Sequence, residues 1–466
     1  MKKLFLITTC FALAFSFVKI KAQGYQALHG SVFTGSTAVF NNPAASVHSA
    51  YKWDLTLFSV QVKLSNNSVY INNSGGTGSG ISFKEGYHSN FLHTNADVSF
   101  LNFLYKIDNA HAINFGIRGR TYTHVKTMPF SSNDSINTIN NFLIANRNTA
   151  YLQAFGTHTG WLEADLNYSQ VLIEHSDSKL SGGITLQIMK GLSGAYFKLN
   201  KISYLETKTA TDTSFSFTNG GAAAAYSANY DESSFKDVYK NSLGALGLSI
   251  GIEYMTYNTE ENTNGNNNIN YDWKIGLSLM DLGSNSFKPC IASGQYYSPN
   301  NTVTDADLSR KFTNISDTKS LKDSLNTLFG NNTDITDNFS ISNPTRLILN
   351  IDKNFGNHFY VNGDLSMNFY STSSSTKLHT RELNLFTITP RWETIGFGAY
   401  LPVQYNTQGQ LWIGAAVKLG PLVLGLHDLG LLFKKDPVIN GGGYLLLSIH
   451  PFNKRKIISK MDCPDR

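Results

Sequence analysis

Residues 161–169 read Trp-Leu-Glu-Ala-Asp-Leu-Asn-Tyr-Ser, and from Leu162 onward apolar and polar side chains alternate without a break. Leu162 and Leu166 belong to one set, and Glu163 and Asp165 to the other. Successive side chains of a β-strand point to opposite faces. This stretch therefore predicts a strand with one apolar face and one charged face, as expected between lipid and a polar lumen.

The same alternation recurs along most of the chain. A transmembrane strand needs about 9–11 residues of this kind. Fourteen segments fit: 53–64, 97–107, 111–126, 161–174, 179–190, 242–257, 271–282, 344–354, 358–370, 381–391, 394–405, 410–419, 421–429 and 441–452. They predict an all-β chain, folded as an antiparallel transmembrane barrel over residues 53–452.

The gaps between these segments support the count independently. Gaps on one side are mostly long: 65–96, 127–160, 191–241, 283–343, 371–380, 406–409 and 430–440. Gaps on the other side are short or moderate: 108–110, 175–178, 258–270, 355–357, 392–393 and Gly420. Bacterial outer-membrane barrels have an even strand number, short periplasmic turns and longer outer loops. A soluble β-sandwich or propeller is the alternative, but it gives no reason for one-sided loops, and no fixed repeat is present.

The ends of the chain read as export and tail segments. Residues 1–22 carry Lys2 and Lys3 before a short apolar core, which predicts a signal peptide cut between Ala22 and Gln23. The signal holds much of the basic excess, so nothing suggests a nucleic-acid partner. Residues 453–466 are expected to form a basic periplasmic tail. No later apolar run is long enough for a membrane-spanning helix.

Residues 23–52 are polar and rich in small side chains, and they precede the first strand. An eight-stranded barrel is already nearly filled by its own side chains. A fourteen-stranded one therefore needs a plug or leaves a pore, and residues 23–52 are the expected N-terminal plug. Within it, Pro43 fixes its own backbone angle and biases Asn42 away from helix, which predicts a tight turn at Asn42-Pro43-Ala44. The predicted lumen face also carries charges of both signs: Arg118, Arg120, Glu163, Asp165, Glu253, Arg346, Asp352, Asp364 and Lys418. Salt-bridge anchors for the plug are the favoured interpretation of these charges, and a role in selectivity is the alternative.

Three outer segments have helical spacing. These are Ile136 to Ile144 with Asn133 or Asp134 as cap, Leu308 with Phe312, and Leu321 to Phe329 after Asp317 and Thr318. Packing against neighbouring loops is the favoured interpretation, and a surface groove for an apolar substrate is the other.

Aromatic residues near strand ends predict interface girdles: Trp53, Tyr105, Tyr122, Trp161, Tyr257, Tyr271, Trp273, Tyr370, Trp392 and Trp412.

Two predicted strands change phase. In 53–64 the apolar set shifts after Leu57, and in 381–391 it passes from Leu385 to Phe386. A shift of one residue is what a β-bulge produces. Barrel curvature explains such bulges, and a sideways opening into the membrane is the alternative.

The chain lacks the common catalytic and metal-binding motifs. Residues 76–80 place Gly78 where a Gly-x-Ser-x-Gly nucleophile would stand, and no His-Glu-x-x-His or Cys-x-x-Cys is present. We therefore expect no enzymatic activity, no cofactor and no metal.

The topology puts Cys290 outside the cell and Cys463 in the periplasm, so these two cannot pair.

The strand count, the N-terminal segment, Asn42-Pro43-Ala44 and the helical outer loops resemble the FadL/TodX-like superfamily of outer-membrane channels. Gly420-Pro421-Leu422-Val423-Leu424-Gly425 resembles an uncharacterised branch with this layout. The resemblance implies an outer-membrane location, contact with lipid, and passive uptake of hydrophobic small molecules, fatty-acid or hydrocarbon-like, past a hatch and through a lateral opening. The alternative is a structural or docking barrel for a secretion or surface-assembly partner protein.

Overall fold

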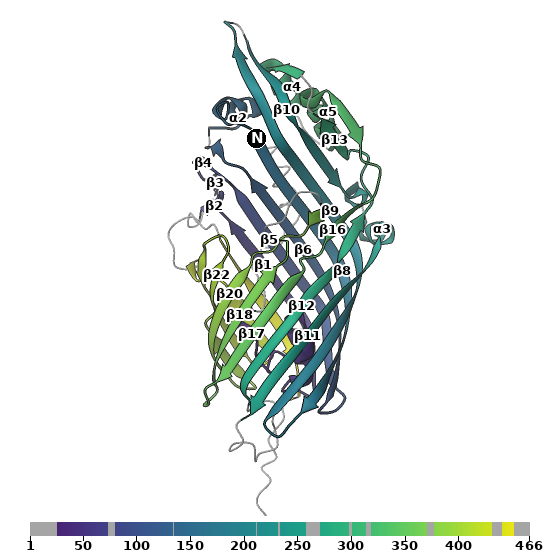
Figure 1. The fold of residues 1–466 in the computed structure, drawn as a ribbon, viewed down its shortest axis with the longest axis vertical. Helices are drawn as coiled ribbons and strands as arrows, with labels where there is room; N and C mark the ends of the chain where they lie inside the picture. Colours follow the sequence, from purple (N-terminus) through teal and green to yellow (C-terminus); the bar gives the residue numbers. More distant parts are fainter. Residues whose placement is uncertain are drawn as a thin grey trace, which may run out of the picture.

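Fourteen antiparallel wall strands close into one barrel in the computed structural model (Figure 1). The structure describes residues 26–72, 80–133, 135–210, 212–231, 234–257, 271–297, 301–313, 318–370, 377–430 and 440–451. The expected signal segment with Ala22 and Gln23, and the tail 453–466, lie outside these ranges. Neighbours in sequence pair around the ring, and the first wall strand pairs with the last from Leu55↔Ile449 to Ser65↔Asn440. The ring therefore has no free edge in its wall.

The wall strands are β1 (Trp53–Asn66), β5 (Phe91–Lys106), β6 (His111–Thr127), β8 (Leu152–Glu174), β9 (Ser178–Lys208), β11 (Gly244–Tyr257), β12 (Tyr271–Phe287), β17 (Arg346–Asn354), β18 (Phe359–Asn368), β20 (Leu385–Glu393), β21 (Phe397–Tyr400) with β22 (Val403–Asn406), β23 (Leu411–Ile413) with β24 (Ala415–Leu419), β25 (Leu422–Leu426) and β26 (Asn440–Ile449). Each contains most of one predicted segment, so the fourteen-stranded count is confirmed. Pro402, which has no N–H to donate, lies where β21 gives way to β22, and Gly414 lies between β23 and β24.

The alternation seen in the sequence separates the two faces of the wall. On β6, Arg118 and Arg120 point inward and are buried, whereas Ile113 and Phe115 are exposed on the outside. All the predicted lumen charges are buried except Arg346, which is half-buried. The exposed outer band is apolar, as a surface that meets lipid must be.

The outer part of the molecule is larger than the sequence indicated. β9 continues far above the barrel and pairs there with β10 (Thr213–Tyr226), a strand that the sequence reading missed (Figure 1). Further outer strands are β2 (Val69–Asn72), β3 (Gly80–Phe83), β4 (Gly86–His88), β7 (Phe130–Ser132), β13 (Gly294–Tyr297), β14 (Asn301–Thr304), β15 (Asn331–Asp334), β16 (Phe339–Ser342) and β19 (Leu378–His379).

Three predicted outer helices are confirmed as α2 (Ile139–Ala145), α4 (Asp305–Thr313) and α5 (Thr318–Phe329), and α3 (Phe235–Asn241) is additional. The apolar faces of α2, α4 and α5 are buried in one core with β9 and β10, where Leu308 and Phe215 are fully covered. Packing against neighbouring segments is therefore the correct interpretation. The cap of α2 is Thr138, whose side chain accepts from Asn141 N, and not Asn133; Asp134 and Asp317 lie outside the described residues.

Of the two phase changes, one is a bulge. The register of β1 against β26 shifts between Thr56 and Phe58. The register of β18 against β20 runs unbroken from Phe359↔Trp392 to Ser366↔Leu385. The predicted bulge in 381–391 is therefore wrong. Leu385 points into the lumen and Phe386 toward lipid, and the apolar residue on the inner face gives the same sequence pattern as a shift of one residue.

The aromatic girdle is confirmed only in part. Tyr105, Trp273 and Trp392 are exposed on the outside. Five others are buried, which contradicts their assignment to the lipid headgroup zone: Tyr122, Trp161, Tyr257, Tyr271 and Trp412. Among the described residues, no helix is long and apolar enough to cross a membrane.

Cys290 provides a simple test of the outer packing. Its side chain is 3% exposed and its thiol donates to Tyr226 Oη at 2.7 Å. We expect a small maleimide to label Cys290 only after denaturation, and non-reducing mass spectrometry to show no bridge to Cys463, which lies outside the described residues. Rapid labelling of the native protein, or a 290–463 bridge, would contradict this topology.

Candidate functional site: the plug and the lumen

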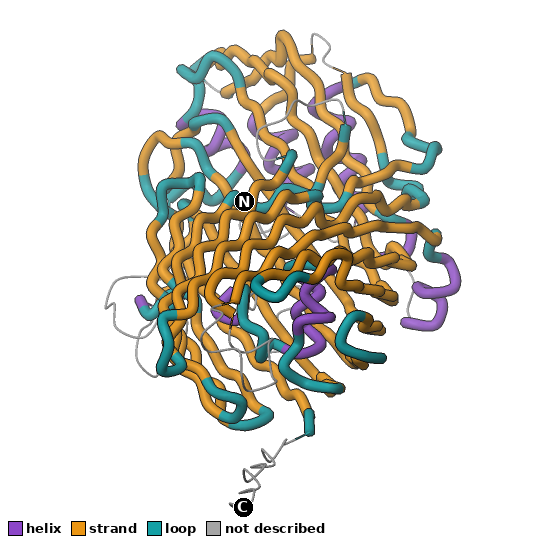
Figure 2. Tube along the Cα trace, turned by 60° about the horizontal axis from the view of Figure 1, so that its bottom comes forward, coloured by secondary structure: helices purple, strands orange, loops and turns teal. Residues whose placement is uncertain are grey.

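The N-terminal segment lies inside the barrel. It runs through three short 3-10 helices, η1 (Gln26–Leu28), η2 (Gly35–Phe40) and η3 (Pro43–His48), before it enters β1. Figure 2, turned so that the end with the short turns comes forward, shows helical turns within the ring of strands. η3 contacts β8, β9 and β11, and η2 contacts β1 and β5. Residues 26–52 therefore fill the lower lumen from wall to wall.

Asn42 joins the plug to the wall with both ends of its side chain. Its Oδ1 accepts from Ala44 N at 3.0 Å, which caps η3, and Pro43 follows at the first helical position. Its Nδ2 donates to Ile252 O of β11 at 3.0 Å. The tight turn expected at Asn42-Pro43-Ala44 is therefore present, and the asparagine also links two separate segments.

Three wall glycines make room for this turn. We call Gly183 of β9, Gly251 of β11 and Gly276 of β12 the glycine seat. A Cβ at Gly251 would stand 2.1 Å from Asn42 Oδ1, one at Gly183 would stand 2.2 Å from Pro43 O, and one at Gly276 would stand 2.7 Å from Asn42 Nδ2. Gly183 and Gly251 are direct partners across two strands. Glycine within a strand marks close approach of another backbone, and here that backbone is the plug.

Hydrogen bonds from wall side chains hold the rest of the turn. Asn167 Nδ2 donates to Pro43 O at 3.1 Å, and Ser278 Oγ donates to Asn41 O at 2.7 Å. Ser46 Oγ donates to Asn167 Oδ1 at 2.9 Å. Such bonds are individually modest, about 1 kcal/mol each, so the seat combines many weak contacts rather than one strong bond.

The plug is not anchored mainly by salt bridges, contrary to the sequence interpretation. Ion pairs between the plug and the wall involve histidines: His29 with Asp364 at 3.3 Å and His48 with Glu253 at 3.9 Å. Ser36 shows the more common arrangement: its N–H donates to Asp54 Oδ1, and Asn102 and Asn114 both donate to its carbonyl.

The lumenal charges pair with one another along the wall instead. Arg118 contacts Asp97 at 3.2 Å, Glu163 at 2.5 Å and Asp165 at 3.2 Å. A second cluster joins Arg391 to Asp352 at 2.6 Å and to Glu393 at 2.7 Å. Buried charges require such partners. These clusters tie neighbouring strands together, and each also contacts the plug: Arg118 Cζ lies 3.7 Å from the centroid of the Phe40 ring, and Glu393 Oε2 accepts from Ser31 Oγ at 2.8 Å.

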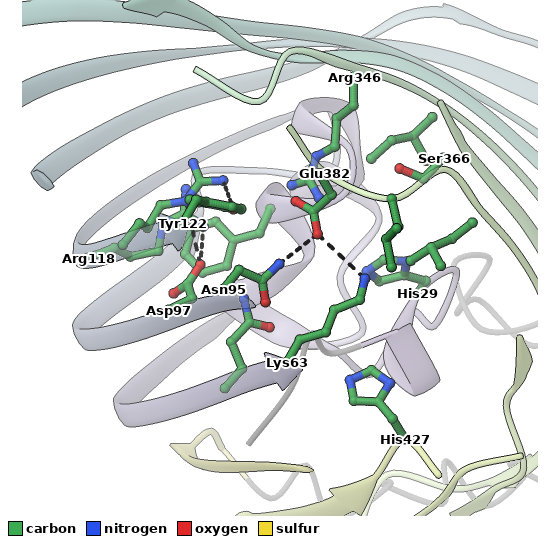
Figure 3. A pocket seen from close by; sticks show the side chains of 16 residues that line it. His29, Lys63, Asn95, Asp97, Arg118, Tyr122, Arg346, Ser366, Glu382 and His427 are labelled. Carbon is green, nitrogen blue, oxygen red and sulfur yellow. Dashed lines mark hydrogen bonds and ion pairs between the residues drawn. The ribbon is translucent and has the colours of Figure 1, made fainter. Parts of the chain in front are cut away.

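A cavity of about 60 Å³ lies above the plug (Figure 3). His29 and Phe40 of the plug form one boundary, and Glu382 extends into it from the segment before β20. Glu382 accepts from Asn95 Nδ2 at 2.6 Å and lies 3.5 Å from Lys63 Nζ. The remaining lining residues are Gln61, Asp97, Arg118, Arg120, Tyr122, Arg346, Ile348, Ser366, Leu383, Leu385 and His427.

Apolar side chains occupy the lumen beside the cavity and the plug. Leu383 and Leu385 pack with Trp412, and all three are almost fully buried. On neighbouring strands a second cluster faces Ala27 and Leu28 of the plug: Tyr400, Ala416, Val423, Tyr444 and Leu446. The lumen is therefore amphipathic, which differs from the polar interior of a water-filled porin.

Sequence reasoning missed the glycine seat, Glu382 and Lys63. Gly183, Gly251 and Gly276 were detectable as glycines on the polar face of predicted strands, but their common neighbour depends on strand register. In the described part of the chain, no group of three or more His, Cys, Asp or Glu side chains could hold a metal ion.

Residues 43–426 match the family described as "Family of unknown function (DUF5723)". The chain belongs to this family. No curated protein matches this DUF5723 chain.

Three solved outer-membrane proteins are similar to this DUF5723 chain at low sequence identity. A deletion mutant of the TodX monoaromatic hydrocarbon channel is 10% identical, with 92% of this chain and 99% of that chain covered and a TM-score of 0.44. A Pseudomonas aeruginosa FadL homologue is 12% identical, with 92% and 97% covered and a TM-score of 0.43. The Ralstonia pickettii toluene transporter TbuX is 12% identical, with 89% and 94% covered and a TM-score of 0.42. At these values the likeness concerns the barrel layout and assigns no residue and no substrate.

The closed ring of fourteen strands, the apolar outer band and the segment inside the lumen make this DUF5723 protein an outer-membrane β-barrel. A barrel with an N-terminal segment inside it is the layout expected from the sequence.

Proposed function

We propose that this protein is a passive uptake channel for small hydrophobic molecules, with residues 23–52 as its hatch and Asn42-Pro43-Ala44 as the anchor of that hatch. The observation that carries the proposal is the amphipathic lumen, in which the plug packs against apolar wall side chains on one side and polar ones on the other. A pore for water-soluble compounds gains nothing from buried Leu383 and Leu385. A hydrophobic solute leaves water more readily where such side chains receive it.

The plug also fits this function. It closes the lumen to ions, and many weak hydrogen bonds hold it, so it can shift without breaking the wall. Movement of the plug would connect the cavity to the apolar cluster around Val423 and Leu446. The bulge in β1 and the breaks at Gly414 and Pro402 lie within a run of neighbouring wall strands, β1, β26, β25, β23 with β24, and β21 with β22, where we place the exit route.

Uptake by proteoliposomes tests the proposal. We expect vesicles that contain the protein to accumulate a labelled hydrophobic compound faster than empty vesicles. The double variant Leu383→Ser with Leu385→Ser should lower that rate several-fold, because each buried leucine contributes about 1.5–3 kcal/mol of apolar transfer free energy. Leu205→Ser is the matched control, since Leu205 is exposed on the outer part of β9. Equal uptake with and without the protein would contradict the proposed function.

A docking barrel for a secretion or surface partner protein is the second candidate. The outer part favours it, because α2, α4 and α5 form a packed core with β9 and β10 at the outer end of the molecule, at the top of Figure 1. The same vesicles separate the two candidates: a docking barrel would leave uptake at the level of empty vesicles.

A further inference from the structure

The cavity above the plug is lined by acceptor atoms that lack partners. Four side-chain oxygens have no hydrogen-bond partner among the described residues: Gln61 Oε1, Asn95 Oδ1, Asp97 Oδ1 and Glu382 Oε2. Asp97 and Glu382 are 3% and 8% exposed, so both carboxylates are almost fully covered. The orientation of Asn95 is determined because its Nδ2 donates to Glu382. Buried acceptors without partners cost free energy, and a ligand that donates to them recovers it.

Donors face the same space. Lys63 Nζ lies 3.5 Å from Glu382 Oε1, and an ammonium group has three N–H bonds to offer. His427 Nε2 has no partner among the described residues. Figure 3 shows Glu382 and Lys63 pointing toward each other, with His427 nearby. A ligand in this place therefore meets a donor and an acceptor side by side.

The lining also has an apolar part. Phe40, Ile348, Leu383 and Leu385 belong to it. A water molecule needs roughly 10–15 Å³ of such space, so about 60 Å³ accommodates a group of roughly four to six heavy atoms. A dry cavity that binds benzene measures about 150 Å³, so a whole aromatic ring does not fit without movement of the plug. The cavity matches one end of a molecule with a single polar group.

Three kinds of end group can be compared. A plain hydrocarbon leaves all four oxygens unpaired. A carboxylate could pair with the cations of the lining, Lys63, Arg118, Arg120 and Arg346, but it has no N–H or O–H to donate and so also leaves all four oxygens unpaired. A hydroxyl donates to Glu382 and accepts from Lys63, and so it pairs with both.

We propose that this cavity binds the hydroxyl-bearing end of a small apolar molecule, an aliphatic alcohol. The inference rests on the proposed uptake function and names its substrate class. Glu382 is the acceptor, Lys63 is the donor, and Leu383 and Leu385 receive the first carbons.

Hexanol, hexanoate and hexane test this choice, because they share a chain length and differ at one end. Each competes against a fluorescent hydrophobic probe bound to the full-length protein in nanodiscs. We expect hexanol to compete about tenfold better than the other two, as the loss of a hydrogen bond to a charged group predicts. Glu382→Leu should abolish that preference, whereas Glu382→Gln, which keeps an acceptor, should retain most of it. Glu85→Leu, at an exposed outer position, is the control and should change nothing.

The outcomes separate this inference from the proposed function. Equal competition by all three compounds, or a preference for hexanoate, overturns the hydroxyl assignment. Intact uptake of hydrophobic compounds without any hexanol preference means that the cavity holds only water, and this also overturns the inference. A hexanol preference that depends on Glu382 supports the site even if vesicle uptake fails, and in that case only the transport proposal falls. Heat-modifiable gel mobility shows that each variant has formed the barrel.

Discussion

Removal of residues 24–45 is expected to convert the closed barrel into a stable open pore in planar bilayers. The deletion takes away η1, η2 and the first turn of η3, which fill the lumen from β1 across to β11. The wall keeps its complete ring of strand pairs, because β1 begins at Trp53 and the charge clusters connect wall to wall. Fourteen strands enclose more space than their own side chains fill, so ions should then pass.

Single-channel conductance and gel mobility measure this result together. The deleted protein should still show heat-modifiable mobility, since the barrel does not depend on the plug for its hydrogen bonds. Unchanged conductance with an intact barrel would show that this segment is not the plug, and the hatch proposal would fall with it. Loss of the folded band would instead show that the plug is required for folding.

A single methyl group at Gly251 is expected to displace the plug from the wall. Gly251→Ala places a Cβ 2.1 Å from Asn42 Oδ1, a distance that real Cβ atoms do not show. Asn42 cannot simply rotate away, because its side chain is bonded both to Ala44 N and to Ile252 O. The turn must therefore leave the glycine seat, and we expect a persistent leak current where the parent protein is closed.

Two further variants make this test specific. Gly363→Ala is the matched control, because a Cβ there has its nearest contact at 3.9 Å, so it should conduct like the parent. Adding Asn42→Gly to Gly251→Ala removes the colliding amide and should restore part of the closed state. If the Gly251→Ala protein conducts no more current than the Gly363→Ala protein, the glycine seat does not keep the plug in its closed position.

The strand content and topology of this protein follow from its sequence alone. Alternation is a local property with a period of two residues. The positions of Glu163, Asp165 and Asn167 therefore indicate which face of their strand points to the lumen, without information from any other strand. The one-sided distribution of long gaps then orders the strands, because antiparallel neighbours need only short turns at one end. The helical spacing of Leu308 and Phe312 is equally local, and α4 forms where it predicts.

Predictions from local pattern were wrong where an aromatic or apolar side chain faces the lumen instead of the membrane. Tyr122 has the same parity as Arg118 and Arg120, so its inward direction was already encoded, yet its aromatic ring suggested the membrane interface. Leu385 is apolar and faces the lumen, where it lines the cavity, and it was misread as a bulge. The missed strand β10 has an Ala-rich end that does not alternate in hydrophobicity, because it packs on the outer sheet rather than between lipid and lumen.

Only the tertiary structure decided what the lumen contains. The pairing of Arg118 with Glu163 depends on the register of β6 against β8, and the glycine seat depends on the registers of β9, β11 and β12 with the plug placed against them. Glu382 and Lys63 are more than 300 residues apart in sequence and meet only because β26 closes on β1. Periodicity determines which face a side chain occupies, whereas register and ring closure determine its neighbours, and those neighbours make the plug seat and the cavity.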